Sequence, residues 1–346
     1  MDQFNFNIPQ NIIFGMNQVN ELVSISKEIG LKHILLVSDR TLESIGYVNR
    51  LCNILKDGGI QVTAFLDVEP NPSIETVESA TAMYREEQCE GIVALGGGSP
   101  MDVAKAVGVL AKYGGDIRTY EGAHKVPGKT VPLIAIPTTA GTGSEVTAFA
   151  VITDKKRNYK LTVFSYELIP SHAILDPTLM MSLPPHAAAS TGIDALVHAM
   201  EAYLSKAASP FTDAMAEKAI EMIGANIRLF VASRNQEGPA SAMLTASTFA
   251  GIAFAWARLG NVHAMAHPLG GYFNVPHGIA NAILLPTVLT YNALADQGRY
   301  KKMYTLLTGQ APLDFEPIML VDVIKDLLEE IGLPKSLSEV GVTEDK

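Results

Sequence analysis

The chain has 346 residues with a net charge of −10 and an isoelectric point of about 5.3; 48% of the residues are hydrophobic and 18% are charged. This composition excludes a disordered chain and predicts a globular protein long enough for two domains. Because the net charge is strongly negative, no basic surface would attract phosphates, and we expect neither nucleic acid nor a membrane as a partner.

Cysteine usage and the first residues of the chain predict a cytoplasmic protein. Cys52 and Cys89 lack CxxC spacing and cannot form a disulfide framework, so we expect ordinary thiols in a reducing compartment. The first residues lack the basic and apolar regions of a signal peptide. No uninterrupted apolar run reaches the roughly 18 residues of a membrane span, since Pro286 interrupts the run at 282–285.

Strands and helices alternate in the first half of the chain. Continuous apolar runs with β-branched residues predict buried parallel strands, and Ser73 is expected to be the N-cap of a helix. The expected strands are 12–15, 33–39, 61–65, 91–95 and 131–136, and the expected helices are 19–29, 40–57, one after Ser73 and one from Pro100. This alternation predicts an α/β domain over 1–183, a parallel sheet with helices on both faces.

The second half of the chain has a different pattern. Strand-like runs disappear after about residue 183, and long amphipathic segments rich in alanine and methionine follow. These segments are 186–206, 211–233, 239–259, 280–296 and 319–331. We therefore predict an all-helical domain over 184–346.

A glycine-rich turn between a strand and a helix is a candidate phosphate site. Gly97, Gly98 and Ser99 follow the apolar run at 91–95 and precede a helical pattern. Glycines let backbone N–H groups approach an anion closely, and the N-terminus of a helix adds partial positive charge. The GxGxxG fingerprint is absent, and an ordinary structural turn is the alternative.

Two further segments carry groups that could bind a nucleotide. Asp39 ends the strand expected at 33–39, where its carboxylate could bind a ribose 2′-hydroxyl or, alternatively, cap the next helix. The loop at 136–147 carries five hydroxyl side chains and two glycines, which could bind a pyrophosphate, a ribose or an amide. Lys160 could reach a ribose or phosphate, although a surface lysine is the alternative.

The segment 260–278 holds three histidines among small residues. His263 and His267 are four positions apart, so they share one face of a helix. A proline and two glycines at 268–271 are expected to end that helix and to let the chain turn back toward His277. Any one histidine taken alone is more simply explained as a core or surface residue.

An upstream pair completes a set of metal ligands. Asp194 and His198 again stand four positions apart. Together with His263 and His277 they would supply one oxygen and three nitrogens, which is typical of a divalent transition-metal site with a position open for substrate. The set permits iron(II), zinc or another divalent metal. His267 is left to support a ligand or to transfer protons.

With these residues assembled, the chain resembles the iron-containing, NAD(P)-dependent alcohol dehydrogenases over essentially its whole length. The resemblance rests on four segments: 70–72, 96–102, 137–144 and the two ligand pairs. It implies a Rossmann-like nucleotide-binding domain similar to that of dehydroquinate synthase, an all-helical metal domain, an active site in the cleft between them and a homo-oligomer of two or more chains. Members generally continue beyond this C-terminus, so the chain looks shortened, and the Ala-Arg pair often found before Met243 is absent.

The resemblance also assigns site residues position by position. It implies iron ligands at Asp194, His198, His263 and His277, with His267 close to the nicotinamide as a catalytic residue. An aspartate at 39 is similar to members that prefer NAD over NADP. The cofactor contacts it implies are Asp39, Asn71, Gly97, Gly98, Ser99, Asp102, Thr138, Thr139, Thr142, Ser144 and Lys160.

The sequence therefore predicts a metal-dependent enzyme that interconverts alcohols with aldehydes or ketones by hydride transfer to or from NAD(H). Phe149 and Phe254 flank the expected cleft and would favour simple alcohols over polyols, or else they are core aromatics. The alternatives are an activity like that of glycerol dehydrogenase or dehydroquinate synthase, and a non-catalytic metal- or nucleotide-binding relative. A synthase acting on a phosphorylated acid would need several cationic side chains near the metal, and the histidine segments carry almost none.

Overall fold

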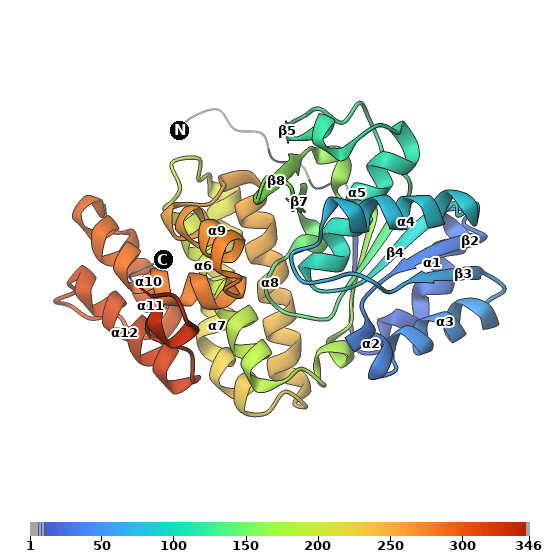
Figure 1. The fold of residues 1–346 in the computed structure, drawn as a ribbon. Coiled ribbons are helices and arrows are strands. Elements are labelled where there is room, and N and C mark those ends of the chain that lie inside the picture. The colour runs from blue at the N-terminus through green and yellow to red at the C-terminus, as the bar shows by residue number, and fades with distance from the viewer. Residues whose placement is uncertain (1–5, 7, 9, 344–346) are drawn as a thin grey trace. The chain divides into compact units, whose positions relative to one another are not determined.

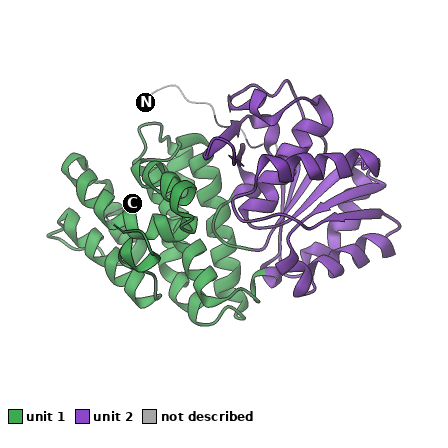
Figure 2. Ribbon diagram, in the orientation of Figure 1, with its two compact units in different colours: residues 1–7, 139–143, 180–346 green, residues 8–138, 144–179 purple. Residues whose placement is uncertain are grey.

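The computed structural model describes residue 6, residue 8 and residues 10–343. The prediction that the N-terminus carries no signal peptide therefore falls mostly on residues outside the described ones. The chain forms two compact units (Figure 2). One contains residues 8–138 and 144–179, and the other contains residues 1–7, 139–143 and 180–346. The main part of the second unit thus begins close to the boundary predicted at 183.

A six-stranded parallel sheet forms the centre of the first unit (Figure 1). Its strands, in spatial order, are β1 (Asn11–Phe14), β9 (His172–Leu175), β6 (Leu133–Pro137), β4 (Gly91–Gly96), β2 (His33–Val37) and β3 (Gln61–Phe65). Every residue of β2, β4, β6 and β9 is buried, as expected for parallel strands that are covered on both faces. The predicted parallel sheet is confirmed.

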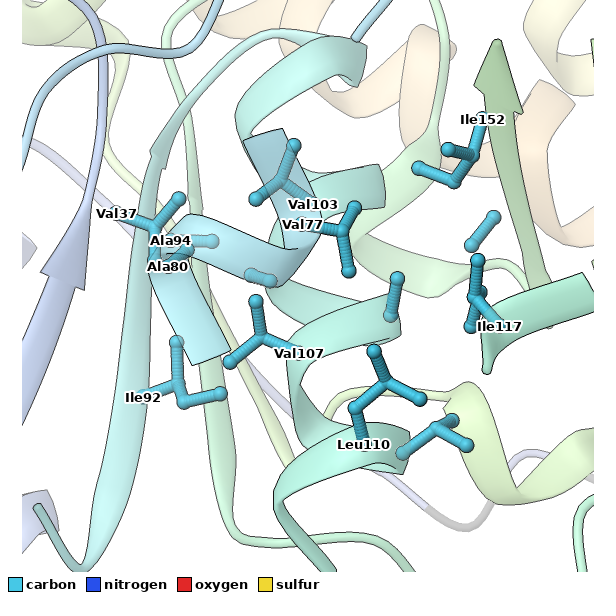
Figure 3. Packing of buried hydrophobic residues seen from close by; sticks show 14 of the residues in the cluster. Val37, Val77, Ala80, Ile92, Ala94, Val103, Val107, Leu110, Ile117 and Ile152 are labelled. Atoms are coloured by element: carbon cyan, nitrogen blue, oxygen red, sulfur yellow. The ribbon is translucent and has the colours of Figure 1, made fainter. Parts of the chain in front are cut away.

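Helices cover both faces of this sheet. Along β2, Ile34 and Leu36 belong to a core that also contains residues of α1 and α3, whereas Leu35 and Val37 belong to a core with residues of α4 and α5. Figure 3 shows the second core, in which Val103 and neighbouring residues of α5 pack together. The helices of this unit are α1 (Leu22–Glu28), α2 (Arg40–Ser44), α3 (Tyr47–Asp57), α4 (Ile74–Glu86) and α5 (Gly98–Tyr113). Ser73 caps α4 as predicted, because its side chain accepts a hydrogen bond from the backbone N–H of Thr76.

The structure corrects two predictions in this unit and adds a second sheet. The helix expected at 40–57 is two helices, because Gly46 adopts a left-handed conformation with φ of 88° between them. Helix α5 begins at Gly98 rather than at Pro100. A second sheet was not predicted: β7 (Phe149–Asp154) and β8 (Tyr159–Phe164) pair antiparallel, and β5 (Gly122–Ala123) pairs with β8.

The described part of the second unit contains helices and no strand, which agrees with the predicted all-helical region. Its α-helices are α6 (Pro185–Leu204), α7 (Pro210–Ala232), α8 (Glu237–Ala257), α9 (Asn261–Phe273), α10 (His277–Asn292), α11 (Arg299–Thr308) and α12 (Pro317–Glu330). Helices α6, α7 and α8 pack against one another, and α10 packs on α6 and α9 (Figure 1). Helix α11 was not predicted. The 3-10 helices of the described residues in both units are η1 (Gln18–Glu21), η2 (Ile117–Tyr120), η3 (Ser144–Val146), η4 (Tyr166–Leu168), η5 (Pro177–Met180), η6 (Ala293–Ala295) and η7 (Ser338–Val340).

Helix α9 does not end where the sequence predicts. It continues through Pro268 and both glycines to Phe273, and ends at Asn274, whose φ is 55°. A proline inside a helix removes the donor to the carbonyl four residues earlier. That carbonyl belongs to Ala264, which is exposed, so solvent can take the place of the missing donor.

Two helical stretches, Glu237–Ala257 and His277–Ala295, are long and apolar enough to cross a membrane by length and composition. In the first, 72% of the apolar stretch is buried inside the protein, and in the second 39% is buried. An apolar core helix of a globular unit meets the same criterion, and α8 packs against α6 and α7 in this way.

Candidate metal centre and nucleotide site

Four side chains from three helices converge in the helical unit. Asp194 and His198 lie one turn apart on α6, His263 lies on α9, and His277 is the first residue of α10. One donor atom from each of the four lies within 4.8 Å of the others. The first three residues are buried, whereas the side chain of His277 is 33% exposed, so the cluster has one accessible side.

The distances in the cluster fit a divalent cation. The Oδ1 atom of Asp194 lies 3.8 Å from Nε2 of His198, 3.8 Å from Nε2 of His263 and 3.7 Å from Nε2 of His277. Ligands about 2.1 Å from a tetrahedral cation are about 3.4 Å apart, so only a small contraction is needed. One carboxylate and three imidazoles, without sulfur, suit iron(II), zinc and other divalent transition metals.

Two of the imidazoles are oriented through their other ring nitrogen. Nδ1 of His198 lies 3.2 Å from the carbonyl oxygen of Gly141, which can only accept a hydrogen bond. Nδ1 of His263 lies 2.7 Å from Oε2 of Glu201, and a carboxylate also accepts. In both rings Nδ1 therefore donates, and Nε2 is left to present a lone pair to the centre.

The electrostatics of the cluster favour an anionic carboxylate. Burial raises the pKa of the Asp194 carboxyl, but the nearby His198, His277 and His263 outweigh burial and hold that pKa far below its ordinary value. Burial lowers the pKa of His198 to about 4. Burial also lowers the pKa of His263, but hydrogen bonds to Asp194 and Glu201 outweigh it and raise the pKa to about 9. A cation bound at Nε2 of His263 would displace that proton, so metal binding and proton release are coupled.

His267 lies at the edge of the cluster and is not one of the four converging groups. Its ring centroid is 6.2 Å from that of His263 and 5.5 Å from that of His277, and the residue is exposed. Phe254, on α8, stacks on His198 with ring centroids 4.4 Å apart. Of the two aromatic residues expected near the substrate, this one adjoins the candidate metal centre.

The candidate nucleotide residues lie at the carboxyl edge of the sheet, where its strand order changes direction. The chain runs from β2 outward to β3, then returns to the other side of β2 with β4 and continues to β6. Ligands of open α/β sheets bind at such a switch point. Asp39 follows β2, and Gly97, Gly98 and Ser99 follow β4 at the N-terminus of α5. Asp39 also caps α2, because its Oδ1 accepts a hydrogen bond 2.9 Å long from the N–H of Leu42.

A buried polar cluster joins α5 to the loop that follows β6. Nζ of Lys105 donates to the hydroxyl oxygens of Ser144, at 2.9 Å, and Thr147, at 3.2 Å, and to the carbonyl of Phe149, at 2.9 Å. The hydroxyl of Ser144 in turn donates to Asp102 over 3.1 Å. Burial raises the pKa of Asp102 to about 6 and lowers that of Lys105 to about 8. The cluster fixes two predicted cofactor residues, Asp102 and Ser144, relative to each other.

Of the remaining predicted cofactor residues, three lie in the unit that contains the six-stranded sheet and two group with the helical unit. Lys160, on β8, donates from Nζ to Oδ1 of Asn71 over 2.8 Å, so these two lie together. The N–H of Thr138 donates to the carbonyl of Gly96 over 3.1 Å, which places Thr138 beside the glycine turn. Thr139 and Thr142, by contrast, belong to the segment 139–143 that groups with the helical unit.

Phe149, the other predicted substrate residue, lies on β7. Its ring stacks on Phe164 with centroids 4.7 Å apart, and its carbonyl accepts from Lys105. In the described structure its ring therefore contributes to the second sheet. Its assignment to a substrate pocket stays a prediction.

The comparisons with known proteins agree with this geometry. Residues 9–177 match the family model described as iron-containing alcohol dehydrogenase, and residues 188–346 match that of the C-terminal part of the Fe-containing alcohol dehydrogenase family. The chain belongs to this family. It is 40% identical to 1,3-propanediol dehydrogenase of Klebsiella pneumoniae, over 99% of this chain and 89% of that protein. It is 36% identical to NAD-dependent methanol dehydrogenase of Bacillus methanolicus, over 99% of this chain and 90% of that protein.

A solved structure of 1,3-propanediol oxidoreductase matches with a TM-score of 0.96 and 39% identity, over 99% of this chain and 91% of that one. The family prediction and the predicted fold are thereby confirmed. As a member of the iron-containing alcohol dehydrogenases, the chain is an oxidoreductase that acts on alcohols. This match favours the alcohol dehydrogenase hypothesis over the synthase-like and binding-only alternatives.

The structure of this family member also identifies three polar residues to which the sequence analysis assigned no role. Glu201 orients His263, Asn281 contacts three of the four candidate ligand side chains, and Lys105 holds the polar loop. Helical spacing was the available signal. Glu201 follows His198 by three positions, and Asn281 follows His277 by four, so each shares a helix face with a predicted ligand.

Proposed function

We propose that this chain interconverts small primary alcohols and aldehydes with NAD(H), at a divalent metal, in the first place iron(II), held by Asp194, His198, His263 and His277. The observation that carries the proposal is the buried cluster of one carboxylate oxygen and three imidazole nitrogens with an accessible side at His277. A cation held by these four side chains would supply Lewis acidity, and a bound NAD(H) would supply the hydride acceptor or donor.

The side chains around the cluster have separable tasks in this proposal. The carbonyl of Gly141 and the carboxylate of Glu201 hold two imidazoles in the tautomer that binds a metal. His267 is exposed one turn beyond His263, so it can exchange protons with solvent, and we assign to its ring nitrogens the transfer of the alcohol proton. Asp102, Ser144 and Lys105 keep the polar loop in position for the cofactor.

Cofactor preference depends on Asp39 in this proposal. A carboxylate at the end of β2 can accept hydrogen bonds from a ribose 2′-hydroxyl and would repel a 2′-phosphate. The proposed cofactor is therefore NAD(H) rather than NADP(H). The relative from Bacillus methanolicus is named as an NAD-dependent methanol dehydrogenase, which is consistent with this choice.

The proposed substrates are short alcohols with a terminal hydroxyl group, including unbranched diols. The relatives are named for 1,3-propanediol and methanol, both of which carry such a group. Phe254 places an apolar ring directly on the proposed ligand His198, and an apolar surface disfavours polyols. Turnover should therefore be faster with butanol and 1,3-propanediol than with glycerol. Faster turnover of glycerol would overturn the substrate proposal. We also propose a cytoplasmic location and a homo-oligomer of two or more chains.

The decisive experiment removes one ligand. His263→Ala should lose bound metal and turnover while it keeps NADH binding, as measured by metal analysis, alcohol oxidation and NADH fluorescence. His186→Ala, at an exposed position near the start of α6, is the matched control and should behave like the parent protein. Undiminished turnover of His263→Ala would refute the ligand assignment.

A further inference from the structure

The amide of Asn281 lies among the atoms that would face the cation. Asn281 is on α10, one turn after His277, and it is completely buried. Its Nδ2 atom lies 2.7 Å from Oδ1 of Asp194, 3.1 Å from Nε2 of His263 and 3.3 Å from Nε2 of His277. One amide nitrogen thus contacts three of the four proposed ligands through the same atoms that would bind the metal.

The Asp194 carboxylate determines which end of the amide faces it. A carboxylate oxygen without a proton only accepts hydrogen bonds, and Nδ2 of Asn281 is the amide atom that lies within hydrogen-bond distance of it, so the amide N–H points toward Asp194. Turning the amide round would place its carbonyl oxygen against the carboxylate oxygen, and the two would repel each other. The 2.7 Å contact is therefore a hydrogen bond donated by Asn281 to a proposed ligand.

The other end of the amide has no partner among the described residues. Oδ1 of Asn281 is buried and has no hydrogen-bond partner among the residues that the structure describes. Unsatisfied buried oxygens are uncommon, and each needs an explanation. A water molecule on that side of the amide would give this oxygen a donor that the described side chains do not provide.

We infer that Asn281 is a positioning residue of the metal centre: its amide N–H fixes the Asp194 carboxylate beside His263 and His277, and the carboxylate oxygen keeps a further lone pair for the cation. This inference rests on the ligand assignment proposed above. Residues that orient metal ligands by hydrogen bonds contribute about ten- to a hundredfold to metal affinity. Loss of the amide should therefore weaken metal binding without affecting the nucleotide residues of the other unit.

The test is a cobalt(II) titration of the metal-free protein in competition with a chelator, with the visible absorption of the bound cobalt recorded. Asn281→Leu, which has nearly the same size and no hydrogen-bonding group, should bind cobalt about ten- to a hundredfold more weakly. Its absorption bands should also change, because the ligands are held less firmly, and NADH affinity should stay at the parent value. Asn292→Leu, at the other end of α10, is the control for the same change of residue.

Two further variants keep the result interpretable. If Asn281→Leu does not fold, Asn281→Ala removes the amide without adding bulk and carries the same expectation. His263→Ala, titrated in parallel, should lose tight cobalt binding. If it does, and the Asn281 variant still binds cobalt like the parent with unchanged bands, the inference about Asn281 alone is overturned. If His263→Ala also binds like the parent, the proposed centre and the inference fail together.

Discussion

Glu201 Oε2 lies 2.7 Å from His263 Nδ1, while Oε1 of the same carboxylate accepts a hydrogen bond 2.7 Å long from the N–H of Val262. Both oxygens of this buried carboxylate thus bind the start of α9, one at the imidazole of His263 and the other at the backbone of Val262. Burial raises the pKa of Glu201, but the hydrogen bond from His263 outweighs it and keeps the group ionised.

Glu201→Gln should therefore weaken metal binding about ten- to a hundredfold. A glutamine can donate from its amide to Nδ1, which would move the ring proton to Nε2, where the metal would bind. Metal content after dialysis against a chelator measures the effect, and Glu237→Gln, exposed at the start of α8, is the control. Equal retention of metal in the two variants would contradict the role of Glu201.

Gly143 lies at a close contact between the loop 139–143 and helix α8. Its φ is 60°, and a Cβ atom there would lie 2.6 Å from the Cα of Gly251 and 3.1 Å from the carbonyl oxygen of Ser247. Gly143→Ala combines backbone strain with overpacking, so it should lower the free energy of unfolding by about 1–3 kcal/mol. Urea denaturation measures this loss. Gly238→Ala, with open space around the added atom, is the control and should cost nothing; a neutral Gly143→Ala would show that the loop can move away.

Asp39 combines two roles that substitution can separate. Its carboxylate caps α2 and, in our proposal, excludes the 2′-phosphate of NADP. Asp39→Asn keeps a capping oxygen and removes the charge, whereas Asp39→Ala removes both. Both variants should gain activity with NADP relative to NAD, and only the alanine variant should lose about 1 kcal/mol of stability. Steady-state kinetics with both cofactors and urea denaturation measure these effects. An unchanged cofactor ratio in both variants would remove Asp39 from the specificity argument.

Local spacing explains what the sequence predicts correctly about the site. Asp194 and His198 stand one helical turn apart, so their convergence requires only that α6 forms. Glu201 was not predicted because its partner His263 lies 62 positions away, on another helix. The tertiary fold brings them together, and the spacing of Glu201 from His198 indicates a shared helix face without identifying this partner.

The same limit applies to the fold. The buried strand β2 is recognisable because residues 34–37 form a continuous apolar run. The break at Gly46 and the continuation of α9 through Pro268 depend instead on surroundings. A glycine can either continue or end a helix, and a proline is tolerated where solvent replaces the lost hydrogen bond. Local propensity does not decide between these outcomes.

The buried Lys105 makes the stability of the first unit depend on pH in alkaline solution. Burial lowers its pKa to about 8, although Asp102 and Glu145 act in the opposite direction. The unfolded chain keeps this proton up to the ordinary value of 10.5, so between these two values the unfolded state binds more protons. The contribution of Lys105 to the free energy of unfolding therefore increases as the pH rises from about 8 to 10.5. This added stability is lost as the pH falls below about 8.

Lys105→Met removes this dependence together with three hydrogen bonds. Near neutral pH the variant should be less stable than the parent by about 1–3 kcal/mol, because Ser144, Thr147 and the carbonyl of Phe149 lose their donor. The difference in unfolding free energy, parent minus variant, should then increase between pH 8 and 10.5, where the folded parent has released its proton and the unfolded parent has not. Urea denaturation at several pH values across this window, with both proteins metal-free, measures the difference. Lys112→Met, at an exposed position of the same helix, controls for the loss of a lysine. A difference that stays constant across the window would mean that Lys105 keeps an ordinary pKa despite its burial.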